Sequence, residues 1–364
     1  MTGLLPEGFH DRLPPEADAA ARLEGHVLRV ARSYGYEQVD PPLAEFADEL
    51  ATRLKAGQLR DAVRFVDPAS QRTLAIRPDL TAQVGRIAAT RMAHHPRPVR
   101  LCYAGQILKL RASELRPERA LRQIGAELIG LDSVAAAREI VRVAVESLQA
   151  AGIGALAVDF TLPDLVDTLA GDTLDTATLA ALRARLDAKD AGGVAEIDAR
   201  YLPLIEAAGP FDKAMARLRA IDTGALTNRL DGLQAIADSI AGDAALTLDP
   251  TERHGFEYQS WLGFSVFARG VRGEIGRGGS YVVVHDDGQD EAAVGFSLYA
   301  DPILDAGLAG GGRRRLFLPF GTPVEAGAAL RAEGWVTVAA LEQDDTPQAQ
   351  LCTHVLGANG PEEA

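Results

Sequence analysis

The stretch RPVRLCYAGQILKLRASELRPERALRQIGAELIG, residues 97–130, decides how the rest of the chain is interpreted. Two strand-like runs, 99–110 and 121–129, flank a loop crowded with Arg and Glu, which predicts a hairpin of two strands. Gln123 and Glu127 are four residues apart, so an extended strand places both side chains on one face. Because burying an unpaired glutamate is costly, this face is either solvated or lines a polar pocket for an amine or imidazole.

Helical and strand-like patterns alternate around this hairpin. Apolar residues recur at three- and four-residue spacing over 23–34, and Gly35 supplies the stop expected beyond a helix. Asp132 or Ser133 can cap a helix with an apolar stripe over 140–148, and another helix is expected over 78–92. Further strands are expected at 155–162, 264–269, 281–285 and 293–299. These patterns predict an α+β fold.

Composition shifts divide the chain into three parts. Between 172 and 249, Ala, Leu and Asp dominate and aromatic residues nearly vanish, which predicts a helical insertion outside the sheet. The body then comprises residues 1–171 and 250–307. Gly310 to Gly312 indicate a hinge, and residues 313–358 predict a small α/β unit. The terminal GANGPEEA is expected to fray.

Charge and cysteine content exclude several classes of function. The net charge is 37 − 51 = −14, which weighs against nucleic acid as the main partner. Cys102 and Cys352 are the only cysteines, which indicates a reducing cytoplasm and argues against a disulfide framework or a zinc site. No run of 18 apolar residues and no signal-like N-terminus occur, so neither a membrane span nor secretion is expected.

The motifs on either side of the hairpin resemble those of class II aminoacyl-tRNA synthetases, and histidyl-tRNA synthetase most closely. Residues 97–130 resemble the second signature motif of that class, preceded by IRPDLTAQVGR at 76–86. QVDPPLAEFADEL at 38–50 resembles the first motif, whose proline lies in the dimer interface of that class. The resemblance implies an antiparallel sheet flanked by helices, a dimer through this interface, and a helical insertion at 172–249.

The resemblance also shows which ATP-binding groups the chain lacks. Synthetases of this class grip the α-phosphate with an arginine and place a glutamate two residues later, where this chain has Lys109 and Arg111. The third motif ends in an arginine that braces the γ-phosphate, and Pro302 stands in its place. We expect this proline to break the helix that should begin there. Loss of both arginines should abolish adenylate formation, which depends on electrostatic stabilisation of the reacting phosphorus.

Other positions match the histidine-binding residues of histidyl-tRNA synthetases. Asp79 and Thr81 stand where an acidic residue and a threonine surround the substrate ammonium group, although Asp79 could instead cap the helix that follows. RHGFEYQ at 253–259 resembles the histidine-recognition motif, with His254 and Gln259 replacing an arginine and a tyrosine. The pocket implied by the resemblance comprises Asp79, Thr81, Gln123, Glu127, Arg253, Glu257, Tyr258 and Tyr281.

Taken together, the pattern resembles HisZ, the family of regulatory subunits of ATP phosphoribosyltransferase. The resemblance implies no catalytic centre, no cofactor, assembly with the catalytic subunit HisG, and histidine as an effector that feeds back on the first step of histidine biosynthesis. The alternative is an active or repurposed class II enzyme that activates an amino acid. A third interpretation is a scaffold that binds HisG without sensing a ligand.

Overall fold

The computed structural model describes residues 4–51, 62–111, 117–253, 260–285, 288, 290–309 and 314–364. The chain forms two compact units, Met1–Ala309 and Gly310–Ala364. Within these described ranges, no helix is long and apolar enough to cross a membrane.

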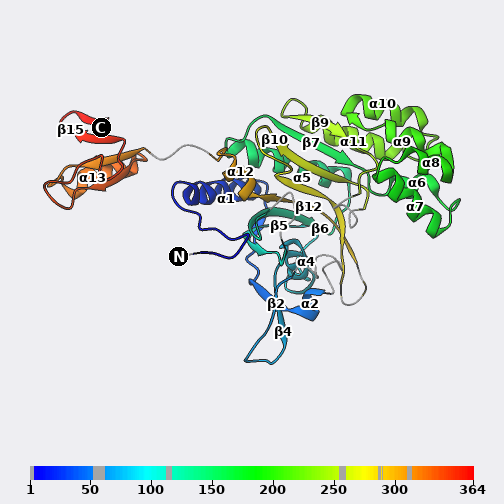
Figure 1. Cartoon of the computed structure of the whole chain (residues 1–364), viewed down its shortest axis with the longest axis horizontal. Coiled ribbons are helices and arrows are strands. Elements are labelled where there is room, and N and C mark those ends of the chain that lie inside the picture. The colour runs from blue at the N-terminus through cyan, green and yellow to red at the C-terminus, as the bar shows by residue number, and fades with distance from the viewer. Residues whose placement is uncertain are drawn as a thin grey trace. The chain divides into compact units, whose positions relative to one another are not determined.

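A nine-stranded sheet organises the first unit (Figure 1). Only its β1–β5 and β7–β9 pairs are parallel, and the other neighbours are antiparallel. The predicted α+β fold with a sheet flanked by helices is therefore confirmed, although the sheet is mixed at its ends. In spatial order the strands are β1 (Glu37–Gln38), β5 (Val99–Leu108), β6 (Ala120–Ile129), β12 (Glu291–Tyr299), β11 (Gly276–Val283), β10 (Gly263–Ala268), β7 (Leu156–Thr161), β9 (Ala244–Leu248) and β8 (Gly209–Pro210).

Two long helices cover one face of this sheet, α1 (Glu16–Ser33) and α5 (Val134–Ala150). The Ser133 side chain caps α5 by accepting a hydrogen bond from Ala136 N at 3.2 Å. The apolar stripes of both helices are buried against alternate sheet residues such as Ile124, Ala126 and Phe296. Because neighbouring strand residues alternate in direction, Gln123, Gly125 and Glu127 lie on the opposite face.

The segment predicted as a helical insertion also contributes strands to the sheet. Figure 1 shows helices α6 to α10 gathered beyond the β7 and β9 end of the sheet. The helices are α6 (Leu165–Ala170), α7 (Thr176–Asp187), α8 (Ala191–Asp198), η1 (Ala199–Tyr201), α9 (Leu202–Glu206), α10 (Phe211–Ile221) and α11 (Thr227–Ser239). However, β9 pairs in parallel with β7, and β8 pairs with β9. The expectation of a segment outside the sheet was therefore wrong for these two strands.

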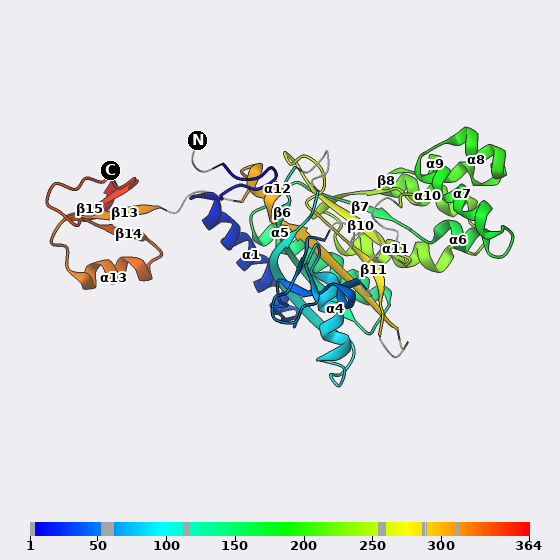
Figure 2. The same cartoon turned by 60° about the horizontal axis from the view of Figure 1, so that its bottom comes forward.

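A smaller sheet and a helix lie on the other side of the main sheet, as the turned view in Figure 2 shows for α4. The small sheet has the order β2 (Ala44–Phe46), β4 (Thr73–Ile76) and β3 (Arg64–Val66), and α2 (Ala47–Ala51) follows β2. Helix α4 (Thr81–Thr90) packs on β5, β6 and β11. Its first residue is therefore placed over the polar face of the main sheet.

The second unit is a four-stranded sheet of order β14-β13-β15-β16 with one helix. Its elements are β13 (Arg315–Leu318), α13 (Val324–Ala332), β14 (Val336–Ala339), β15 (His354–Gly357) and β16 (Gly360–Glu363). The C-terminal residues were expected to fray, but β16 pairs antiparallel with β15. Gly360, with φ of +120°, makes the tight connection that allows this pairing.

Candidate functional site

The candidate site lies on the polar face of the main sheet, where a row of glycines begins beside Glu127. In register, Glu127 of β6 is opposite Gly295 of β12, which is opposite Gly279 of β11, which is opposite Gly263 of β10. Residues directly opposite one another in antiparallel strands project from the same face. Because glycine has no side chain, the sheet surface along this row carries a single side chain, the Glu127 carboxylate.

The Glu127 carboxylate is buried and bound by three hydroxyl groups. Tyr103 donates to Oε1 at 2.9 Å, Thr81 donates to Oε1 at 3.1 Å, and Tyr281 donates to Oε2 at 2.8 Å. Glu127 is only 1% exposed. Strands β5, β6 and β11 and the first residue of α4 thus converge on one acidic group.

A second set of hydrogen bonds links Gln123 to this group. The Gln123 amide nitrogen donates to Ser297 Oγ at 2.7 Å and to Asp79 Oδ2 at 3.2 Å. Its amide oxygen accepts from Leu80 N at 2.9 Å. Ser297 Oγ in turn lies 3.0 Å from the Tyr103 hydroxyl. Gln123 therefore fixes the start of α4 relative to the sheet.

These residues border a small polar cavity that opens to solvent. Its empty space, counted together with the open solvent at its mouth, is about 220 Å³. The cavity is lined by Thr81, Glu127, Arg277, Gly278, Gly279, Tyr281, Gly295, Phe296 and Ser297.

Glycines create the space that the buried side chains occupy. A Cβ at Gly295 would lie 1.6 Å from Glu127 Oε2, which is far inside van der Waals contact. A Cβ at Gly125 would lie 2.5 Å from the Tyr103 hydroxyl oxygen. The position of the carboxylate and of one of its donors thus depends on the absence of a side chain on a neighbouring strand.

Burial gives Glu127 an unusual proton affinity. Burial raises the pKa of Glu127, the hydroxyl donors Tyr281 and Tyr103 lower it, and the charge of Asp79 raises it, with a resulting pKa of about 8. Burial also raises the pKa of Tyr103 well above its usual value, so this phenol stays a hydrogen-bond donor. At neutral pH a proton and a cationic ligand therefore compete for the Glu127 carboxylate.

This raised pKa predicts a pH-dependent stability. Because the pKa of Glu127 is about 8 when folded and about 4.5 when unfolded, the folded state binds the extra proton between these values. The stabilising contribution of protonated Glu127 is complete below pH 4.5 and is lost as pH rises through 8. Glu127→Gln should therefore gain stability relative to wild type between pH 5 and 9, by up to about 5 kcal/mol. Urea unfolding of both proteins measures this, and a pH-independent difference would contradict the raised pKa.

The structure brings five of the predicted pocket residues into one hydrogen-bonded network: Asp79, Thr81, Gln123, Glu127 and Tyr281. Asp79 precedes Leu80, the N-cap residue of α4, which has no side-chain cap hydrogen bond, so Asp79 is not the cap residue itself. Its Oδ1 accepts from Thr81 N at 2.7 Å at the start of α4, while its Oδ2 accepts from Gln123. Asp79 thus orders the beginning of the helix and also belongs to the polar network.

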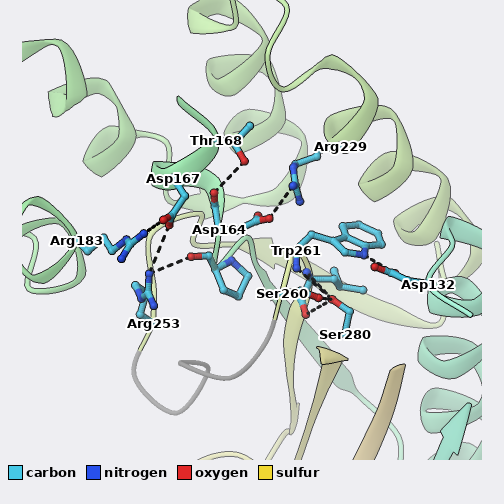
Figure 3. Close-up of polar contacts among 12 residues, drawn as sticks. Asp132, Asp164, Asp167, Thr168, Arg183, Arg229, Arg253, Ser260, Trp261 and Ser280 are labelled. Atoms are coloured by element: carbon cyan, nitrogen blue, oxygen red, sulfur yellow. Dashed lines mark hydrogen bonds and ion pairs between the residues drawn. The ribbon is translucent and has the colours of Figure 1, made fainter. Parts of the chain in front are cut away.

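Arg253 is placed elsewhere, against α6 and α7 (Figure 3). Its Nη1 donates to Pro163 O at 3.3 Å and lies 3.9 Å from Asp167 Oδ2, while Arg183 pairs with the same aspartate. Its backbone N donates to Asp187 Oδ1 at 2.7 Å. The guanidinium thus contacts the helical segment and is not among the described residues that line the cavity. Glu257 and Tyr258, together with His254 and Gln259, lie outside the described residues.

Beyond that segment, the chain is fixed again at Ser260 and Trp261, also drawn in Figure 3. Ser260 donates to Ser280 Oγ at 2.9 Å, and Trp261 Nε1 donates to Asp132 Oδ1 at 2.7 Å. These bonds attach the start of β10 to β11 and to the residue before the cap of α5. Both boundaries of the segment 254–259 are therefore held by polar contacts.

The three positions at which the resemblance predicted lost ATP contacts lie after the ends of strands. Lys109 and Arg111 follow β5, and Lys109 N donates to Arg119 O at 2.8 Å. Pro302 was expected to prevent a helix, but α12 (Ala300–Asp305) forms around it. The expectation was wrong because Pro302 lies in the first turn, where backbone N–H groups have no helical partner. Asp301 beside it accepts from Arg12 at 2.9 Å and from Arg122 N at 2.7 Å.

Sequence reasoning missed several residues of the site, among them Tyr103, Ser297, Gly295 and Arg277. Tyr103 and Ser297 contact each other across 194 residues of sequence, so only the strand register reveals their proximity. No role was predicted from the sequence for Arg277 or Gly295. The even spacing of Arg277, Gly279 and Tyr281 was the available signal, because it places all three on one face of β11.

Comparisons with known proteins identify the family of the chain. Residues 8–303 match the family model described as Histidyl-tRNA synthetase. The chain is 42% identical over 348 residues to the ATP phosphoribosyltransferase regulatory subunit of Rhodospirillum centenum, covering 93% of this chain and 89% of that protein. It is 39% identical over 370 residues to the protein of that name in Paramagnetospirillum magneticum, covering 98% and 97%. The chain belongs to the family of ATP phosphoribosyltransferase regulatory subunits.

Solved structures show that this family fold extends to synthetases. A crystal structure of an ATP phosphoribosyltransferase regulatory subunit/histidyl-tRNA synthetase from Bacillus halodurans superposes with a TM-score of 0.80 at 20% identity, covering 98% of both chains. Histidyl-tRNA synthetase from Nostoc superposes with a TM-score of 0.79 at 15% identity, covering 99% of this chain and 92% of that one. At these identities the likeness establishes the fold alone. The predicted relationship to HisZ and to histidyl-tRNA synthetases is confirmed.

Proposed function

We propose that this regulatory subunit has no catalytic centre of its own, assembles with the catalytic subunit HisG, and conveys histidine feedback to it. HisG joins ATP to phosphoribosyl pyrophosphate in the first step of histidine biosynthesis, a cytoplasmic pathway. The effector site in this proposal is the cavity beside Glu127. The observation that carries the proposal is the buried network around Glu127, because an anionic carboxylate among hydroxyl donors suits the ammonium group of an amino acid.

The electrostatics at the ATP positions support a role without adenylate formation. The segment Ala300–Asp305 contains no Lys or Arg, and its Asp301 carboxylate is bound by Arg12 and by Arg122 N. Lys109 supplies a positive charge but not the planar, bidentate fork of an arginine. An amino-acid pocket that persists without both phosphate-binding arginines suits an effector site better than an activation site.

The contacts of α4 support a connection between this pocket and a dimer through residues 38–50. Thr81 at the start of α4 binds Glu127, and two residues later Gln83 Nε2 donates to Pro42 O at 2.8 Å. Arg86, on the next turn, forms an ion pair with Glu45. A ligand that shifts the start of α4 would therefore move the segment proposed as the dimer interface. Such a coupling requires that histidine bind the two states of the assembly with different affinity.

We expect this chain to activate a short HisG from the same source, and histidine to reverse that activation. The physical basis is a coupling free energy between the effector site and HisG, which is typically about 1–3 kcal/mol. Phosphoribosyltransferase activity of HisG, measured with and without the chain across a histidine titration, tests both parts. An unchanged HisG activity would contradict the proposal. Histidine-dependent exchange of pyrophosphate into ATP by the chain alone would instead indicate an amino-acid-activating enzyme.

A further inference from the structure

The cavity beside Glu127 carries charges of both signs. Glu127 projects from β6 and Arg277 from β11, and both line the cavity. The strands are separated by β12 alone, whose Gly295 and Ser297 are the residues opposite Glu127 and Arg277. With about 4.8 Å between neighbouring strands, the two backbones lie roughly 10 Å apart across the sheet. The long side chains thus approach the same space from opposite sides.

Arg277 is held in a defined position by a neighbouring carboxylate. Its Nε donates to Glu274 Oε1 at 3.0 Å, and its Nη2 lies 2.5 Å from the same oxygen. Glu274 is itself fixed by Ser265, whose Oγ donates to Oε2 at 3.2 Å. The Arg277 side chain keeps 26% of its surface exposed, so it is oriented by the protein but not buried by it. A guanidinium held in this way loses little conformational entropy when a ligand binds.

We propose that Arg277 binds the carboxylate of an α-amino acid in this cavity, while the Glu127 side binds its ammonium group. The inference rests on the proposed function, and it adds the residue that makes the site selective for a zwitterion. Of the described residues that line the cavity, Arg277 alone is cationic. Arg253, the arginine that the sequence suggested, faces Asp167 and Pro163 O instead.

The glycine row explains why a compact ligand fits between the two charges. Gly279 and Gly295 line the cavity on the face of the sheet that carries Glu127 and Arg277, so the sheet surface between the two charged residues has no side chains there. The α-carbon of an amino acid can therefore lie near the strands with its two charged groups toward opposite walls.

A comparison of two ligands isolates the proposed contact. Histidine carries both charged groups, whereas histamine keeps the ammonium and the imidazole but lacks the carboxylate. Calorimetric titration of the full chain should show histidine binding about tenfold or more tighter than histamine, because a charge-assisted contact is lost with the carboxylate. Arg277→Gln should lower histidine affinity by the same factor and leave histamine affinity within about twofold.

Two further variants control for charge and for folding. Arg277→Lys keeps the charge but loses the bidentate fork, so an intermediate histidine affinity is expected. Arg272→Gln removes an exposed arginine shortly before β11 and outside the cavity lining, so neither affinity should change. Equal loss of histidine and histamine binding in Arg277→Gln would show a structural role and overturn the proposal. Equal affinity of wild type for histidine and histamine would overturn the proposed Arg277–carboxylate contact but not histidine sensing. Absence of binding by both ligands would refute the effector site itself.

Discussion

Glu127→Gln is expected to remove histidine binding almost completely, with an affinity about 100-fold or more below that of wild type. The substitution keeps the size and one carbonyl oxygen of the side chain, so the cavity retains its shape. It removes the negative charge that a buried ammonium group needs, and breaking a buried charge pair in this way costs roughly 3–5 kcal/mol. Calorimetric titration of the full chain with histidine measures the affinity directly. Histidine inhibition of the complex with HisG should disappear in parallel.

A matched substitution on the other face of the sheet separates this effect from a general loss of charge. Glu146 of α5 accepts from the Tyr34 hydroxyl at 2.8 Å and pairs with Arg142 at 2.6 Å, far from the cavity lining. Glu146→Gln should leave histidine affinity unchanged. If Glu127→Gln retained wild-type affinity and wild-type inhibition, the cavity would not be the histidine site.

The pH dependence of binding distinguishes Glu127 from a surface carboxylate. With a pKa of about 8, Glu127 is mostly protonated in the free protein at pH 7, and ammonium binding favours its ionised form. Histidine binding near neutral pH would therefore release a proton from this carboxyl, and affinity would rise as pH approaches 8. Ionising the buried Glu127 carboxyl costs free energy, which a cationic ligand offsets and a neutral ligand does not. The pocket is therefore selective for cations.

The sequence could predict the hairpin and one face of it, because strand periodicity is a local property. The four-residue spacing of Gln123 and Glu127 predicted that both lie on one face of the strand. The structure shows both in one hydrogen-bonded network. Their partners depend on register between distant strands. Ser297 reaches Gln123 across 174 residues, and no local pattern encodes that distance.

Two expectations failed because tertiary context overrode local composition. The sequence AALTL of β9 lacks a β-branched run, yet it pairs in parallel with β7 because the sheet offers an edge there. Arg253 was assigned to the pocket through its place next to a recognised motif. Its guanidinium lies beside Asp167 of α6, a helix that the sequence patterns did not predict. In both cases the local sequence does not specify which other part of the fold the segment packs against.

Gly295→Ala should destabilise the protein and abolish histidine binding. Both effects are expected from one steric clash. The new Cβ would lie 1.6 Å from Glu127 Oε2 and 2.9 Å from Ala126 O, so the Glu127 carboxylate must leave its position. Overpacking of this kind costs about 1–3 kcal/mol, and the displaced carboxyl would lose the hydroxyl donors Tyr103 and Tyr281. We expect a loss of roughly 3 kcal/mol in the free energy of unfolding. Denaturant unfolding and histidine titration measure the two effects.

A second glycine and a double variant make this prediction specific. Gly25 lies within α1, and a Cβ there would meet nothing within 4 Å, so Gly25→Ala should stabilise the protein by roughly 0.5–1 kcal/mol.

In the Gly295→Ala background, Glu127→Ala removes the atoms that clash and should restore much of the lost stability without restoring histidine binding. Such recovery follows only if the two residues oppose each other across β6 and β12. Additive destabilisation in the double variant would mean that Gly295 is required for another reason, and that the carboxylate does not depend on the space beside it.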